Sequence, residues 1–101
     1  MATDPQRMEW ILEQMEGAGN LRYRKMFGEY GVYCDEVFFA VVCDGTLFIK
    51  PTQAGRAVLG QPVLQPPYQG AKPSFRLDDL TDRERLIELI RATIGELSRK
   101  R

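Results

Sequence analysis

The chain has 101 residues, no histidine, and fourteen Lys and Arg residues that balance fourteen Asp and Glu residues. This length predicts one domain, residues 1–101, and zero net charge excludes a protein drawn to nucleic acid or anionic membranes by its overall field. Without histidine, the chain cannot build a His-based metal site, a His general base or a Ser-His relay.

A helix is predicted to begin at Pro5, where proline suits the first turn and Thr3 or Asp4 can act as the cap. Its end is expected at the segment Gly17-Ala-Gly-Asn20. One side of this helix carries apolar residues at helical spacing: Met8, Ile11, Leu12 and Met15. Trp10 falls on the opposite side, so either a neighbouring segment covers it or it is exposed for a partner.

Four strands are predicted next, at residues 21–27, 30–34, 37–43 and 46–49. The last three form a meander, closed by the turn pairs Asp35-Glu36 and Asp44-Gly45. The strand "VFFAVVC" is apolar on both faces, whereas an antiparallel strand with one wet face alternates. The centre of the sheet is therefore expected to be covered on two sides, by helices or by a second subunit.

The remaining chain predicts a short helix after Pro51, capped by Thr52 and ended by Gly60. The segment "QPVLQPPYQGAKP" holds four prolines and is expected to be a stiff, extended loop, and "SFRLDD" a last edge strand. A capping box at residues 81–84 opens a long C-terminal helix with a wide apolar face. The order predicts an α+β fold, a single antiparallel meander sheet of four to five strands packed with three helices.

Two glycines and a basic cluster flank the first predicted turn. Gly28 and Gly31 match neither the P-loop nor the dinucleotide motif, so a bulge or bend in the sheet is the favoured explanation. In "LRYRK", Arg22 and Arg24 share one face of a strand, while Tyr23 and Lys25 share the other. These residues form either an ordinary solvated edge or a surface for single-stranded nucleic acid, with help from the basic tail "SRKR".

Other polar residues suggest little chemistry. Lys50 and Lys72 each precede proline and could converge into an anion pocket, although surface lysines need no such explanation. Cys34 and Cys43 should lie at opposite ends of neighbouring strands, too far apart for a disulfide and without further metal ligands. No nucleophile, base and oxyanion site come together, so we expect no catalytic residues, no metal, no cofactor and no enzyme. The absence of a signal-like or membrane-spanning segment indicates a cytoplasmic protein.

The amino-acid sequence of residues 23–75 is a more specific sign of relationship to known proteins than these patterns are. "RKMFGEYGVYCDEVFFAVVCDGTLFIKPTQAGRAVLG", followed by "PPYQGAKPSF", resembles the N-terminal domain of the TfoX/Sxy family, bacterial regulators of competence genes. The resemblance implies a secretion-chaperone-like α+β fold and a role in gene activation, and it brings no catalytic residue set. Full-length members carry a second, helical domain, so this chain is expected to be a stand-alone N-terminal domain.

The leading hypothesis is therefore a non-enzymatic module that works through protein contacts within a transcription-control complex, and homodimerisation is expected as well. Its expected interaction surface comprises Trp10, Arg22, Arg24, Lys25, Met26, Phe27, Gly28 and Tyr30. Direct nucleic-acid binding through Arg22, Arg24 and Lys25, and an anion or small-molecule site at Lys50 and Lys72, are the alternatives. No membrane partner is expected.

Overall fold

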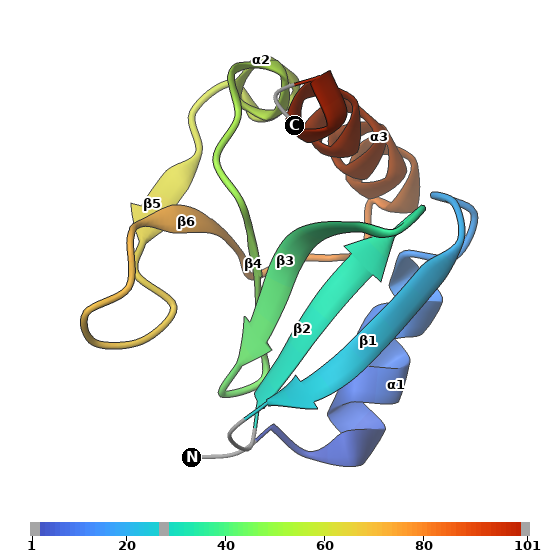
Figure 1. Cartoon of the computed structure of the whole chain (residues 1–101), viewed down its shortest axis with the longest axis vertical. Coiled ribbons are helices and arrows are strands. Elements are labelled where there is room, and N and C mark those ends of the chain that lie inside the picture. The colour runs from blue at the N-terminus through green and yellow to red at the C-terminus, as the bar shows by residue number, and fades with distance from the viewer. Residues whose placement is uncertain (1–2, 27–28, 100–101) are drawn as a thin grey trace.

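The computed structural model describes residues 3–26 and 29–99, which form the predicted α+β fold with three helices and one antiparallel sheet (Figure 1). The described strands are six, one more than the upper predicted number, and lie in the order β1-β2-β3-β4-β6-β5. In chain order the elements are α1 (Pro5–Gln14), β1 (Leu21–Met26), β2 (Glu29–Cys34), β3 (Val37–Cys43), β4 (Thr46–Ile49), α2 (Gln53–Leu59), β5 (Val63–Gln65), β6 (Ser74–Leu77) and α3 (Arg83–Arg99).

Local chemistry explains most of the boundaries. Asp4 caps α1, because its side chain accepts a hydrogen bond from the backbone N–H of Gln6, and Pro5 occupies the first turn. Thr52 caps α2 in the same way through the N–H of Gly55. Gly60 ends α2 with a positive φ of 79°. These boundaries confirm the sequence predictions.

The two hairpin turns of the meander also fall where the sequence predicts them. Asp44 and Gly45 have φ values of 52° and 76°, as the tight turn requires. Asp35 and Glu36 adopt φ values of 51° and 67° without any glycine, a strained arrangement for two ordinary residues. Strain at this turn needs support from outside the hairpin.

That support comes from hydrogen bonds to the Asp35 carboxylate. One of its oxygens accepts the backbone N–H of Asn20 at 2.8 Å, and the other accepts the Arg91 guanidinium at 2.8 Å. Arg91 also donates to the carbonyl of Ala18, so one side chain of α3 ties down both the turn and the loop between α1 and β1. The Asn20 N–H, followed by the Arg91 guanidinium, lowers the pKa of Asp35.

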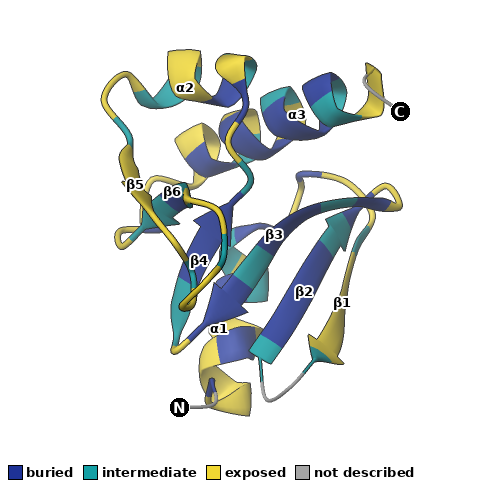
Figure 2. Ribbon diagram, turned by 60° about the vertical axis from the view of Figure 1, so that its left-hand side comes forward, coloured by how far each residue is buried: buried dark blue, intermediate teal, exposed yellow. Residues whose placement is uncertain are grey.

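The strand register assigns the buried side chains to one face of the sheet. Val32 pairs with Ala40, Val42 with Leu47, and Ile49 with Phe75, so these residues share a face. This face packs in one core with apolar residues of α1 and α3 (Figure 2), which include Met8, Ile11, Met15, Leu86, Leu89, Ile90 and Ile94. Cys34 and Cys43 pair with Val37 and Thr46 as predicted, and both are free thiols.

Three details of the C-terminal half differ from the sequence predictions. The proline-rich segment contains the short strand β5, so β6 lies between β4 and β5 and is no edge strand. The cap of α3 is Asp82, whose side chain accepts the N–H of Arg85, while the Thr81 hydroxyl donates to Asp79. Asp82 is the N-terminal cap because the helix begins at Arg83, one residue later than a cap at Thr81 requires.

Helix α2 packs on α3 through a close approach and a shared acidic residue. A β-carbon at Gly55 would lie 2.8 Å from Thr52 Oγ1 and 3.1 Å from Leu89 Cδ1, so glycine lets the helices approach without displacing these side chains. The buried Glu96 of α3 accepts the backbone N–H groups of Gln53 and Ala54, at 3.2 and 2.9 Å. A carboxylate there satisfies two otherwise orphan donors at the positive end of α2. Within the described residues, no helix combines the length and the apolar character that crossing a lipid bilayer requires.

Replacing Glu96 by alanine should lower the free energy of unfolding by about 2–3 kcal/mol, because two charge-assisted hydrogen bonds are lost from a buried site. Urea denaturation followed by circular dichroism measures this. The control Glu88→Ala changes an exposed position of the same helix and should cost less than about 0.5 kcal/mol. Equal losses in the two variants would contradict the role of Glu96.

The pKa of Asp35 predicts a pH-dependent stability. Because folding lowers this pKa, the contribution is present at neutral pH and is lost as the pH falls through the folded value. Asp35→Asn keeps a side chain that tolerates positive φ, so the urea-midpoint difference from wild type should be clear at pH 6 and should shrink as the pH falls through the lowered pKa of Asp35. Arg91→Met should remove part of the same dependence. A difference that stays constant with pH would refute the assignment.

Candidate ligand pocket and basic sheet edge

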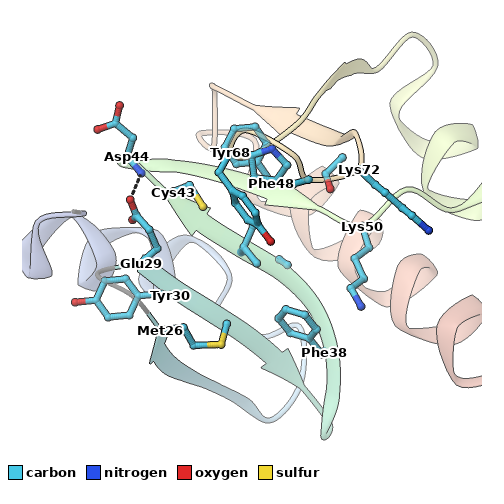
Figure 3. Close-up of a pocket in the computed structure, with 15 residues that line it drawn as sticks. Met26, Glu29, Tyr30, Phe38, Cys43, Asp44, Phe48, Lys50, Tyr68 and Lys72 are labelled. Atoms are coloured by element: carbon cyan, nitrogen blue, oxygen red, sulfur yellow. Dashed lines mark hydrogen bonds between the residues drawn. The ribbon is translucent and has the colours of Figure 1, made fainter. Parts of the chain in front are cut away.

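The face of the sheet opposite the helices is hollowed into a pocket of about 860 Å³ (Figure 3). The register places Val41 and Phe48 side by side on this face. Phe38, from the same strand as Val41, extends the apolar floor. Tyr68, Ala71 and Lys72 border the pocket from the loop that joins β5 to β6. The second face of β3, which the sequence marks as too apolar for solvent, is therefore the floor of this hollow.

Gly31 shapes the floor by lacking a side chain. It lies within β2, paired with Arg24 and Val41, and a β-carbon there would come 2.5 Å from Met26 Cε and 3.1 Å from Phe38 Cε1. The predicted bend thus does not explain Gly31: its backbone is regular strand, and the glycine makes room for two apolar side chains. The one irregularity between β2 and β3 lies further on, between Val32 and Tyr33.

The loop beside the pocket owes its shape to proline and glycine. Pro66, Pro67 and Pro73 restrict the backbone, and Gly70 has a φ of 91° within a tight turn in which Ala71 N–H donates to the carbonyl of Tyr68. Tyr68 is 63% exposed although it borders the pocket. It is a rim residue, open on its outer side, and no member of the core.

Charges in the pocket are separated. Lys50 and Lys72, which the sequence suggested as an anion site, both line it and stand at the same end in Figure 3. Among residues 3–26 and 29–99, no carboxylate lies within ion-pair distance of either lysine, and Lys50 Nζ sits 4.4 Å from the centre of the Phe38 ring. Glu29 and Asp44 lie toward the other end (Figure 3).

The carboxylate of Glu29 is already used by the fold. One oxygen accepts the backbone N–H and the hydroxyl of Thr3, and the other accepts the N–H of Asp44 at 3.1 Å. These bonds fasten the start of the chain to the hairpin between β3 and β4. Glu29 is therefore a structural residue, and the acidic end of the pocket is less available than the basic end.

Cys43 contributes a buried, unreactive thiol to the pocket lining. Burial raises its pKa to about 11, and the nearby Glu29 and Asp44 add to the rise. Burial also raises the pKa of Cys34. A thiol of this kind is protonated at neutral pH, which makes it a poor nucleophile.

The basic cluster lies on β1, the strand at one edge of the sheet. Arg22 is committed to Glu36, 2.7 Å from Arg22 Nε to the carboxylate, and its guanidinium stacks on Tyr33 at 4.4 Å. Arg24 and Lys25 are exposed, and within the described residues neither makes an ion pair. The cluster therefore offers two free cations where the sequence suggests three.

The other predicted interaction residues are dispersed. Met26 and Tyr30 border the pocket, whereas Trp10 is 37% exposed on α1, on the other side of the sheet, with the Arg7 guanidinium 4.6 Å from its ring. Phe27 and Gly28 lie outside the described residues. The sequence does not single out Phe38, Phe48 or Tyr68, because alternation along a strand does not show which face is hollowed, and a loop residue follows no such alternation.

Comparison with known proteins assigns the family. The TfoX N-terminal domain model matches residues 13–96, so the chain belongs to that family. This confirms the resemblance seen in the sequence of residues 23–75. The chain is also similar to an uncharacterized 12.7 kDa protein in the trpE 5′ region of Spirochaeta aurantia. The two are 36% identical over 98 residues, which cover 96% of this chain and 85% of that protein.

The raised pKa of Cys43 predicts slow alkylation. In a Cys34→Ala variant at pH 7.5, iodoacetamide should modify native Cys43 about 100-fold or more slowly than the urea-unfolded chain, because two pKa units separate about 11 from the ordinary value of 9.0. Mass spectrometry of timed samples measures both rates. Comparable rates in the folded and unfolded chains would contradict a protonated, buried thiol.

Proposed function

We propose that the protein is a non-enzymatic regulatory module of the cytoplasm that controls gene expression through contact with another protein. The observation that carries this proposal is the open edge of β1, a six-residue strand whose exposed Arg24 and Lys25 make no ion pair with any described residue. The resemblance to the TfoX/Sxy regulators supports the regulatory part. The raised pKa of Cys43, which keeps this buried thiol protonated at neutral pH, supports the non-enzymatic part.

An edge strand can accept a further strand. On an edge strand, part of the backbone N–H and C=O groups point away from the sheet and are free to pair with an extended segment. The opposite edge, β5, has only three residues, so β1 is the longer platform. Arg24 and Lys25 project to opposite sides of β1 and would flank an added strand.

The charges favour a partner with acidic residues over a second copy of this chain. If β1 paired with itself about its centre, Arg22 of one copy would stand opposite Lys25 of the other, and like charges in that position are destabilising. The argument for a homodimer was the doubly apolar β3, and the second face of β3 is partly covered by the chain's own β5–β6 loop. An extended acidic segment of a transcription-control protein fits this edge better than a second copy of β1, because it would place opposite charges beside Arg24 and Lys25.

Direct nucleic-acid binding is the weaker reading of the same edge. Arg22 is neutralised by Glu36, and Arg24 and Lys25 lie on different faces, so the strand presents no continuous cationic surface. Nucleic-acid binding would show affinity that falls steeply with salt and weakens with Arg24→Ala. Fluorescence anisotropy with labelled single-stranded DNA at low salt distinguishes the two mechanisms.

The test of the proposal is site-specific crosslinking in cells. A benzoylphenylalanine at position 24 should crosslink one discrete protein, because the edge lies within its interface, whereas the same group at position 56 on exposed α2 should not. The double variant Arg24→Glu/Lys25→Glu should prevent association of that protein. It should also fail to restore the transcript profile of a deletion strain.

The matched control is Arg56→Glu/Arg99→Glu, which makes the same change in net charge at two exposed positions away from β1. This variant should restore the transcripts as wild type does. Restoration by the β1 variant, or crosslinking as strong from position 56 as from position 24, would refute the β1 edge as the contact.

A further inference from the structure

The pocket on the open face of the sheet has the dimensions of a small-molecule site. Its volume of about 860 Å³ falls within the range of roughly 300–1,000 Å³ that ligand pockets occupy. The lining is mostly apolar and includes the aromatic rings of Phe38, Phe48 and Tyr68. Such a lining with a few convergent polar groups is the usual composition of a binding site.

The polar groups are arranged for an anion at one end. Lys50 directly follows β4 and Lys72 lies in the β5–β6 loop, so two lysines 22 residues apart in sequence line the same end of the pocket. Neither lysine has a carboxylate partner among the described residues. Lys50 is half-buried and its Nζ lies against the Phe38 ring, where the surrounding water is reduced and a charge interacts more strongly.

We propose that this pocket binds a small amphipathic anion. Its carboxylate, sulfonate or phosphate pairs with Lys50 and Lys72, and its flat aromatic or aliphatic body lies on Phe38, Val41 and Phe48. Tyr68, mostly exposed on the rim, covers the outer side of the body. Two ammonium groups match one anionic group and are too few for a polyphosphate.

This site is separate from the proposed protein contact. Arg24 and Lys25 do not line the pocket, and Lys50 and Lys72 do not belong to β1. Among the described residues, Met26, the last residue of β1, is the one that belongs to both. Charge variants on the edge and in the pocket can therefore be tested independently, and either proposal can fail while the other stands.

The test compares two fluorescent probes that differ chiefly in charge. 8-Anilino-1-naphthalenesulfonate carries an anionic group, and N-phenyl-1-naphthylamine has the same apolar body without it. The double variant Lys50→Met/Lys72→Met keeps two long side chains and removes both charges. It should weaken binding of the sulfonate about 10-fold, as expected from two partly exposed charge pairs, and change binding of the neutral probe less than about 2-fold.

Matched controls and a mapping experiment complete the test. Arg24→Met/Lys25→Met also removes two charges and should leave both probes unaffected. In nitrogen-15 correlation spectra, the sulfonate should shift the amide signals of Val41, Phe48 and Ala71. The shifts should saturate with one sulfonate bound per chain. Ala71→Phe should fill the mouth of the pocket and weaken both probes, with circular dichroism confirming that each variant is folded.

Competition then identifies the natural chemistry. Decanoate, decyl phosphate and 2-naphthoate are compared with neutral 1-decanol as displacers of the sulfonate probe. Displacement by at least one of the anions at lower concentration than 1-decanol supports the site, and the best anion gives its class. Unchanged sulfonate affinity in the pocket variant, equal loss of both probes there, or shifts that map elsewhere would overturn the proposal.

Discussion

The structure depends on a strand that is apolar on both sides. β3 lies in the middle of the described sheet, and one of its faces packs in the core with α1 and α3. The other face supplies Phe38, Val41 and Cys43 to the pocket floor. Within the described part of the chain, the cover of the second face comes from Met26 and the proline-rich loop, while the helices pack on the first face. The pocket forms because the second face of the sheet is covered less completely than the first.

The same constraint explains how the chain is fastened around the sheet. Asp35 with Arg91, Glu29 with Thr3, and Glu96 with the N-terminus of α2 each join segments far apart in sequence through a carboxylate that accepts backbone N–H groups. Each carboxylate is consumed by these bonds. These three carboxylates therefore serve the fold, whereas Lys50 and Lys72 line the pocket without a carboxylate partner among residues 3–26 and 29–99.

The sequence predicts the helices, strands and turns well. It predicts less well which strands lie side by side in the sheet. The bounds of β3 and β4, the Asp4 and Thr52 caps and the Asp44-Gly45 turn follow from short-range chemistry and are confirmed. β5 is missed because three residues between prolines carry no periodicity, and β6 is misplaced at an edge because its partner was not recognised. The role of Gly31 is missed since its reason lies across two strands, in Met26 and Phe38.

By itself the sequence determined the α+β class and the family, because these rest on periodicity, turn residues and the specific sequence of the central segment. Only the tertiary structure decided which polar residues meet. It brought Lys50 and Lys72 to one pocket, gave Arg22 to Glu36, and sent Trp10 to the far side of the sheet. These outcomes depend on strand order and loop path, which no local interaction encodes.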